Sequence, residues 1–528
     1  MLRNKNYVYG PTDIQVPSHL HLGHYMLDRL MEFKDGKIIN GQTHEITTLG
    51  QIAQQSMNLA VSLTHMGVRK GDVVGLCSEN RVEFWSSVIG TVLSGAILTT
   101  INMNYTKGEI THVLGISKPK FIICSETAFK PHEKTFKSIR HLKKIIVYGD
   151  NSKEVSYNDL IFKKNVNFDD FVATDVNGLE DLAFILYSSG TTGLPKGVML
   201  THLNCLNTLC HPMVEPPFKP IVLNVNPWFH ALGLMAGLVG LSQGRTIVFL
   251  PRFEMDLFLR TIEKYKITVA PVVPPILVAL TKTDIKYDLS SVMVIICGAA
   301  PLSNEISNAV QKIFPNAMPV LQAYGMTECT LAITRNVNIS QPLPKCVGGA
   351  TYTIIIKVVD VETKEPLGPH KPGEVCVKGG VVMKGYIGKD RKDDFDDEGF
   401  FRTGDVAYYD EEGNFYIVDR LKELIKYKGF QVAPAEIEAV LLQHPAVRDA
   451  GVVGVPDAQA GEVPRAFVAL QPGAKAAAEE LQSFVAERLS KPKHLRGGVR
   501  FVPDIPKNPS GKILRRELRK LAQEKSKL

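Results

Sequence analysis

Short apolar runs alternate with amphipathic stretches along the first two thirds of the chain. Between residues 71 and 320, apolar runs rich in β-branched residues fall at 73–77, 121–124, 144–148, 182–187, 246–250, 267–273 and 292–297. Stretches with helical apolar periodicity lie between them, for example at 255–265 and 305–313. Strands buried on both faces of a parallel sheet have this continuous apolar character, and helices connect them. The pattern therefore predicts doubly wound α/β structure.

The pattern changes twice toward the C-terminus. From 349 to 416, short strand-like runs separated by Gly and Asp turns predict a small β-rich unit, a β-barrel. Beyond Asp419 and Arg420 alanine and valine are abundant, and residues 441–500 contain no isoleucine or asparagine. A helix at 434–442 and a strand at 450–455 predict an α+β unit there. The break fits a domain boundary and also a chimeric or recently diverged segment.

These patterns predict two domains, because 528 residues are too many for one hydrophobic core. We expect an N-terminal domain over residues 1–419, built from two doubly wound α/β subdomains plus the small β-barrel. We expect a smaller, mobile α+β C-terminal domain over residues 420–528.

Composition narrows the class of partner. The hydrophobic share is 45%, the charged share 22%, and the net charge of +7 is mild for this length and not concentrated in one block. This argues against a nucleic-acid partner. The eight cysteines are scattered without a C-x-x-C pair, which is typical of free thiols. Residues 1–18 lack the apolar core of a signal peptide, and no apolar stretch is long enough for a transmembrane segment.

The last three residues are Ser526-Lys527-Leu528. The peroxisomal import receptor reads this tripeptide when it stands at a free C-terminus. A lysine-rich tail can produce it by chance, but the terminal position favours targeting. We therefore expect a peroxisomal protein with that receptor as a partner.

A segment rich in Ser, Gly and Thr directly follows the apolar run at 182–187. Its polar and glycine residues are Ser188, Ser189, Gly190, Thr191, Thr192, Gly193 and Lys196. Glycines let successive N–H groups converge on an anion, and the hydroxyls and the lysine add donors. The Walker A spacing is absent, and such loops are often only linkers. An unbroken run that ends in a lysine after a strand nevertheless favours oligophosphate binding.

Five further segments follow in a fixed order. They are Pro227-Trp228-Phe229-His230, Gly298-Ala299-Ala300-Pro301, Gln322-Ala323-Tyr324-Gly325-Met326-Thr327-Glu328, Phe401-Arg402-Thr403-Gly404-Asp405 and Pro506-Lys507-Asn508-Pro509-Ser510-Gly511-Lys512. Together with the loop at 188–196 they resemble the adenylate-forming superfamily of acyl-CoA synthetases, peptide-synthetase adenylation domains and firefly-type luciferases. The chain looks most similar to insect luciferase-like and 4-coumarate–CoA-ligase-like acyl-CoA synthetases, from about residue 9 to residue 528.

This resemblance implies a nucleotide site. The loop at 188–196 would clamp the phosphates, Thr327 would contact the α-phosphate, Glu328 would hold Mg²⁺, and Asp405 would accept the ribose hydroxyls. Other residues implied to bind ATP or AMP are Gly298, Ala299, Ala300, Gln322, Ala323, Tyr324, Gly325, Arg420 and Gln431.

It also implies two half-reactions in one cavity. The substrate carboxylate attacks the α-phosphate of ATP and releases pyrophosphate, and the thiol of CoA then displaces AMP. Lys512 would serve adenylation and Lys426 thioester formation, with His230 beside the acyl carboxylate. The remaining residues implied are Arg252, Lys428 and Gly429 for CoA, Leu232, Ala236 and Leu331 with His230 for the acyl pocket, and Asp419 and Lys422 for a hinge.

We therefore predict an AMP-forming acyl-CoA synthetase that uses ATP, Mg²⁺ and CoA. A medium- or long-chain fatty acid is the first expected substrate and an aryl-propenoate the second. The alternative is a luciferase, a monooxygenase that reuses the adenylation step. Beetle luciferases carry a small hydroxyl residue where Leu331 stands, so the leucine favours the ligase.

Activation of amino acids for a carrier protein is disfavoured. Such domains usually place an acid near the segment of His230, whereas Ala231 and Leu232 follow it here. Ala299 and Ala323 stand where many relatives have glycine, which leaves the size of the substrate open.

Overall fold

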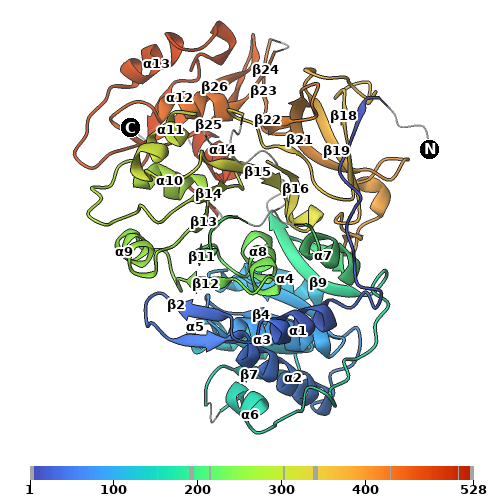
Figure 1. The fold of residues 1–528 in the computed structure, drawn as a ribbon. Helices are drawn as coiled ribbons and strands as arrows, with labels where there is room; N and C mark the ends of the chain where they lie inside the picture. Colours follow the sequence, from blue (N-terminus) through green and yellow to red (C-terminus); the bar gives the residue numbers. More distant parts are fainter. Residues whose placement is uncertain are drawn as a thin grey trace.

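The structure is a computed structural model that describes residues 5–150, 153–189, 195–212, 216–300, 302, 304–336, 343–428, 430–508 and 511–523. The tripeptide at 526–528 therefore lies outside the described residues. Figure 1 shows a large N-terminal part with two α/β layers and a smaller C-terminal domain at one end. Among the described helices, none is long and apolar enough to cross a membrane.

The first layer is an eight-stranded sheet in which six neighbouring strands, from β9 to β8, are parallel. Its order is β20 (Gly385–Tyr386), β10 (Pro195–Thr201), β9 (Leu182–Ser189), β5 (Ile97–Ile101), β4 (Val73–Cys77), β6 (Phe121–Cys124), β7 (Lys144–Val147) and β8 (Val155–Ser156). The helices of this region are α1 (Leu22–Glu32), α2 (Leu49–His65), α3 (Glu83–Leu93), α4 (Lys107–Ser117), α5 (Glu126–Ser138), α6 (Tyr157–Phe162) and α7 (His202–Leu209).

The second layer is a nine-stranded sheet with a parallel centre and antiparallel edges. Its order is β17 (Gly349–Ala350), β16 (Ala332–Arg335), β15 (Leu321–Gly325), β14 (Val294–Cys297), β13 (Val269–Val272), β11 (Ile221–Asn224), β12 (Thr246–Phe249), β2 (Lys37–Asn40) and β3 (Ile46–Thr48). Its helices are α8 (Ala231–Ser242), α9 (Met255–Tyr265), α10 (Pro274–Leu280) and α11 (Asn304–Ile313).

The two layers share one continuous core around α8. Trp85 of α3 and Trp228 just before α8 pack with their ring centroids 4.6 Å apart, and both are fully buried. A Cβ atom at Gly237 of α8 would lie 2.1 Å from the ring of Trp85. The glycine therefore lets the helix approach the first layer closely, and the two subdomains pack as one body.

The small β-rich unit is a five-stranded antiparallel sheet. Its order is β1 (Tyr7–Tyr9), β18 (Ile354–Val359), β19 (Gly373–Gly379), β21 (Phe401–Tyr409) and β22 (Phe415–Arg420). The first strand comes from the N-terminus, as the dark blue segment beside β18 and β19 in Figure 1 shows. The predicted domain boundary falls at the end of β22.

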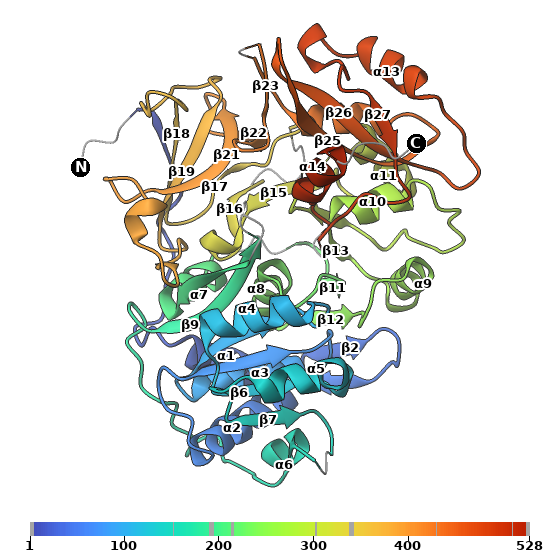
Figure 2. The ribbon, with the colours of Figure 1, turned by 180° about the vertical axis from the view of Figure 1, so that it is seen from behind.

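The C-terminal domain has a core of its own, formed by residues from Ile425 to Leu518. Its sheet contains β24 (Phe430–Val432), β23 (Ile425–Tyr427), β26 (Gly461–Leu470), β25 (Val447–Asp457) and β27 (Val499–Phe501). Its helices are α12 (Pro434–Leu441), α13 (Ala478–Ala486) and α14 (Arg515–Gln523). Viewed from behind, in Figure 2, α14 lies on the side of this domain that faces the N-terminal part.

The predicted fold class is confirmed, with a large α/β N-terminal part and a smaller C-terminal domain. The apolar runs correspond to β4, β6, β7, β9, β12, β13 and β14, and the helix at 255–265 coincides with α9. The strands β5 and β11 were not predicted. Two threonines interrupt the apolar run in β5, and β11 has only four residues.

Candidate active site

The predicted nucleotide residues gather where β14 and β15 end. These strands are parallel neighbours, with Cys297 opposite Gln322. In such sheets ligands bind beyond the carboxyl ends of the strands. The turn at Gly298-Ala299-Ala300 lies against β15, because a Cβ atom at Gly298 would be 3.4 Å from the carbonyl oxygen of Ala323.

Two backbone positions shape this edge. Ala299 has φ of +73°, a left-handed conformation that glycine adopts more easily than alanine. At Gly325 a Cβ atom would lie 1.8 Å from the carbonyl oxygen of Leu331, so only glycine fits there. The chain then turns into the short 3₁₀ helix Thr327–Cys329, in which Thr327 and Glu328 are each 5% exposed. Leu331 is partly buried against the main core.

Glu328 is linked to the predicted phosphate loop through Tyr386. The hydroxyl of Tyr386 donates to Oε1 of Glu328 at 2.7 Å, and the ammonium of Lys196 lies 4.7 Å from the centroid of the Tyr386 ring. Lys196 stands directly opposite Ser188 in the β9–β10 ladder. Burial and the nearby Lys389 lower the pKa of Lys196. Tyr386 was not predicted, because a lone tyrosine in the two-residue strand β20 carries no chemical signal.

The centre of the predicted phosphate loop lies outside the described residues. This applies to Gly190, Thr191 and Thr192, and the side chain of Ser189 is likewise not described. The described ends of the loop nevertheless place Ser188 and Lys196 together near Glu328.

Asp405 is a buried carboxylate with two partners. Its Oδ2 accepts a hydrogen bond from the hydroxyl of Tyr324 at 2.7 Å, and its Oδ1 lies 3.2 Å from Nε of Arg420. Asp405 and Arg420 are opposite each other in the β21–β22 ladder. Burial and the negative charge of Asp405 raise the pKa of Tyr324 well above its usual value. The structure thus brings three predicted nucleotide residues together.

His230 stands at the N-terminus of α8. Its Nδ1 accepts from the backbone N–H of Leu232 at 3.4 Å. Burial, with a smaller contribution from the cation of Lys512, lowers the pKa of His230 to about 4. The imidazole is therefore neutral near pH 7. Leu232 and Ala236 lie one helical turn apart and are both partly exposed, so they share an apolar face of α8.

Lys512 reaches this site from the C-terminal domain. It closes a tight turn in which its backbone N–H donates to Oδ1 of Asn508 at 2.9 Å, and the N–H of Asn508 donates to the carbonyl oxygen of Lys512 at 2.9 Å. Gly511 packs against the N-terminal part, because a Cβ atom there would lie 2.7 Å from Cγ of Pro275. Burial and then the charge of Arg420 lower the pKa of Lys512 to about 8.

A cavity of about 580 Å³ opens beside the turn of Lys512. Residues of both domains line it, including His230 and Arg252 from the N-terminal part and Asn508 and Gly511 from the C-terminal turn. Asn80 shapes its wall. The amide of Asn80 donates to the carbonyl oxygen of Asn226 at 3.0 Å, and its Oδ1 accepts from the N–H of Trp228 at 2.9 Å. Asn80 was not predicted, because its role depends on chain segments about 150 residues away.

Other predicted residues lie apart from this site. Lys426 and Gln431 face each other across the β23–β24 hairpin, and both are exposed. In Figure 1 this hairpin lies at the outer edge of the C-terminal domain. Lys428 is also exposed, and Gly429 lies outside the described residues.

The two predicted hinge residues differ in their surroundings. Asp419 is buried and accepts from the N–H groups of Arg420 at 2.7 Å and Ala435 at 3.1 Å. Lys422 is exposed. The chain therefore passes from a buried, hydrogen-bonded carboxylate at Asp419 to the protein surface at Lys422.

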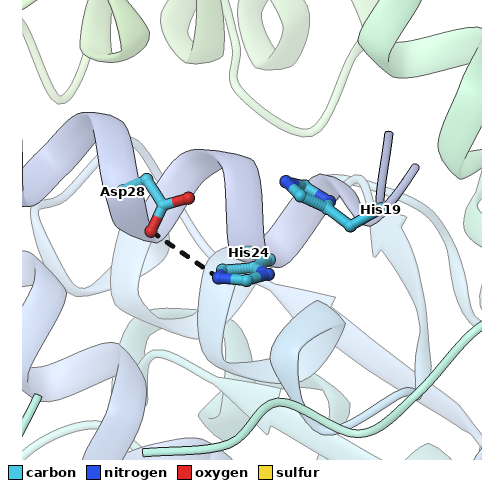
Figure 3. Close-up of side chains that lie close together, drawn as sticks. All are labelled: His19, His24 and Asp28. Carbon is cyan, nitrogen blue, oxygen red and sulfur yellow. Dashed lines mark ion pairs between the residues drawn. The ribbon is translucent and has the colours of Figure 1, made fainter. Parts of the chain in front are cut away.

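A group of possible metal ligands lies far along the chain from these residues. His19, just before α1, and His24 and Asp28 within it have ligand atoms within 4.8 Å of one another. Figure 3 shows the three side chains side by side. All three are exposed, and Nε2 of His24 is 3.7 Å from Oδ1 of Asp28. Nδ1 of His19 accepts from the backbone N–H of His21 at 2.9 Å. Exposed groups of this kind are common without an ion, so we assign no metal to the cluster.

Comparison with known proteins agrees with this geometry. The family described as "AMP-binding enzyme" matches residues 30–387, and its C-terminal domain matches residues 436–512. A luciferin 4-monooxygenase of Nipponoluciola cruciata is 40% identical over 89% of this chain and 88% of its own length. A 4-coumarate–CoA ligase of Petroselinum crispum is 38% identical over 96% of this chain and 95% of its own length.

A solved structure gives the same result for the fold. The crystal structure of ATP-bound MatB from Rhodopseudomonas palustris superposes with a TM-score of 0.85 at 28% identity, and covers 96% of this chain and 99% of that one. The resemblance inferred from the motifs is therefore confirmed.

Proposed function

The chain belongs to the family of AMP-binding enzymes, the adenylate-forming enzymes, and on this basis we propose that it is an acid–thiol ligase that makes acyl-AMP and then acyl-CoA. One observation carries the proposal. Lys512 from the C-terminal domain lies close enough to Asp405 and His230 of the N-terminal part to interact with both electrostatically. A ribose acceptor, a neutral histidine and a cation therefore surround one space.

The first half-reaction follows from these groups. The substrate carboxylate attacks the α-phosphorus of ATP, an oxygen–phosphorus bond forms, and pyrophosphate leaves. Negative charge grows on the α-phosphate oxygens and the leaving group, and the ammonium of Lys512 stabilises it. Neutral His230 can hydrogen-bond to the carboxylate without forming an ion pair that would weaken it as a nucleophile. Asp405 and Arg420 hold the nucleotide in line.

Glu328 suits a divalent cation. It is a buried carboxylate near Lys196 with one oxygen oriented by Tyr386, and Mg²⁺ binds one or two carboxylates together with phosphate oxygens and water. When bound there, Mg²⁺ would neutralise part of the phosphate charge.

The second half-reaction would use the cavity of about 580 Å³. The thiol of CoA attacks the acyl carbon of acyl-AMP, a carbon–sulfur bond forms, and AMP leaves. Arg252 at the cavity wall is suited to a CoA phosphate. Because Lys426 lies away from the site, we propose that the C-terminal domain rotates near Asp419 and Lys422 to bring it there.

The acid is proposed to be apolar. Leu232 and Ala236 give α8 an apolar face beside His230, and Leu331 is apolar too. A medium- or long-chain fatty acid and an aryl-propenoate both fit this character. The similarity to a 4-coumarate–CoA ligase supports the second class.

A luciferase is the second candidate, and the 40% identity to a luciferin 4-monooxygenase favours it. In that reaction acyl-AMP would react with O₂ in place of CoA. The apolar side chain of Leu331 provides no hydroxyl group for a luciferin ring, which supports the ligase.

The test is pyrophosphate release with ATP, Mg²⁺ and a panel of carboxylic acids, with and without CoA, while light is recorded. The ligase requires dark turnover that yields acyl-CoA and depends on CoA. Turnover that is independent of CoA and emits light would make the protein a luciferase. The absence of pyrophosphate release with every acid would overturn the proposal.

Peroxisomal import through residues 526–528 stays a prediction, which a fluorescent fusion with and without the tripeptide can test.

A further inference from the structure

The helix α10 contacts the C-terminal domain at both of its ends. At its start, a Cβ atom at Gly511 of the C-terminal turn would lie 2.7 Å from Cγ of Pro275. Just after its end, the ammonium of Lys282 donates to the carbonyl oxygen of Val447 at 2.8 Å and to that of Arg448 at 3.4 Å. Figures 1 and 2 both show α10 beside the C-terminal domain.

A β-bulge presents these two carbonyl groups. The ladder between β25 and β26 shifts register between Val447 and Asp449, so Arg448 is an extra residue in β25. A bulge leaves its extra residue out of the ladder and bends the strand. The start of β25 therefore offers two acceptors to one cation of the N-terminal part.

The same bulge is connected to the turn that contains Lys512. A carboxylate oxygen of Asp449, Oδ2, lies 2.6 Å from the ammonium of Lys507. Lys507 pairs with Ile513 in an antiparallel bridge, so these two residues form the base of the turn. A contact of Lys282 with the bulge is thus transmitted to the base of the turn that positions Lys512.

The contact joins the two domains that move in the proposed reaction. Lys282 belongs to the N-terminal part, whereas Val447 and Arg448 belong to the C-terminal domain. These hydrogen bonds exist while Lys512 is in the site, and a rotation that brings in Lys426 breaks them. An interaction made in only one of two orientations shifts the equilibrium toward that orientation.

We propose that Lys282 is a positioning residue for adenylation, which holds the bulge of β25 so that the C-terminal domain keeps Lys512 in the active site. The inference rests on the proposed function, because it assumes that Lys512 and Lys426 serve the two half-reactions in turn. Lys282 acts through the orientation of the domain.

The direct test measures the orientation of the domains without measuring activity. Nitroxide labels are attached at Lys107→Cys and Lys475→Cys, two exposed positions in the two domains, and dipolar spectroscopy gives the distance between them with ATP and Mg²⁺. Cys210→Ser prevents labelling elsewhere, since the other seven native cysteines are buried. One charge-assisted hydrogen bond corresponds to about a tenfold change in an equilibrium constant. In Lys282→Met, the population with the distance of this structure should therefore fall about tenfold relative to the other.

Two further variants serve as controls. Lys286→Met removes a lysine four residues later, whose exposed ion pair with Asp284 is 4.0 Å long, and it should leave the ratio of the populations unchanged. Lys282→Arg keeps a cationic donor and should restore most of the ratio.

Activity gives the second readout, because the two half-reactions should change in opposite directions. For two equally populated orientations, a tenfold shift lowers the fraction competent for adenylation from one half to about one tenth. Pyrophosphate release by Lys282→Met then falls about fivefold, and thioester formation from supplied acyl-adenylate rises about twofold. A general loss of stability would lower both.

An unchanged ratio of the two populations in Lys282→Met would overturn the inference, and so would a wild type with no population at the distance of this structure. Equal loss of both half-reactions, with a lowered melting temperature, would show a purely structural role and would also overturn it. Failure of the wild type to release pyrophosphate with any acid would instead count against the proposed function, and the label distances would stand independently of it.

Discussion

Asp405→Asn should remove most of the preference for a nucleotide with free ribose hydroxyls. The substitution keeps the size of the side chain and its contact with Tyr324, but it removes the negative charge that pairs with Arg420. A carboxylate can accept two hydrogen bonds from a vicinal diol, and each hydrogen bond to a charged group contributes about 1.5–3 kcal/mol. Two such bonds at the lower limit contribute about 3 kcal/mol, or roughly 100-fold in affinity.

The assay compares the affinity for ATP with that for 2′,3′-dideoxy-ATP by calorimetry. The wild type should bind ATP about 100-fold more tightly than the dideoxy nucleotide, and the variant less than about tenfold. The same substitution leaves Arg420 without its partner, so the ratio of the two affinities is more informative than either affinity alone.

Asp410→Asn is the matched control. Asp410 follows β21 directly, is also buried, and accepts from the N–H of Asn414 at 2.8 Å and the hydroxyl of Tyr416 at 3.2 Å. It should keep the full preference for ATP. If Asp405→Asn retained the same preference as the wild type, Asp405 would not be the ribose acceptor.

Two further substitutions test how the backbone and the buried charge pair of Arg515 and Glu438 support the site. Gly325→Ala places a Cβ atom 1.8 Å from the carbonyl oxygen of Leu331. It should lower the free energy of unfolding in urea by at least about 2 kcal/mol and abolish pyrophosphate release. Stability equal to that of the wild type would refute this. Arg515→Met leaves Glu438 buried without its cation, so it should lower the free energy of unfolding by about 3–5 kcal/mol. Calorimetry would show this as loss of the unfolding transition of the C-terminal domain. A decrease below about 1 kcal/mol would contradict the importance of the buried charge pair.

The fold class could be predicted because buried parallel strands are continuous apolar runs. The runs that became β4 and β6 are apolar along their whole length. The position of β1 in the β-rich unit could not be predicted. Its three residues pair with β18, which lies about 350 positions later in the chain. Local patterns contain no information about such distant pairing.

The site was predicted through motifs, and its supporting residues were not. Asp405, Arg420 and Tyr324 were predicted separately, and the structure shows them in contact. Tyr386 and Asn80 have no motif of their own, since each acts by joining segments that are distant in sequence. Ala299 stands where many relatives have glycine, and the structure shows that its φ angle is positive.

The most direct test of the account separates the two half-reactions in two variants. Lys512→Ala and Lys426→Ala are assayed for pyrophosphate release with an accepted acid, and for thioester formation from supplied acyl-adenylate and CoA. The account predicts that Lys512→Ala loses adenylation and keeps thioester formation, because Lys512 lies at the proposed nucleotide site, and that Lys426→Ala does the reverse. Equal loss of both half-reactions in both variants would contradict it.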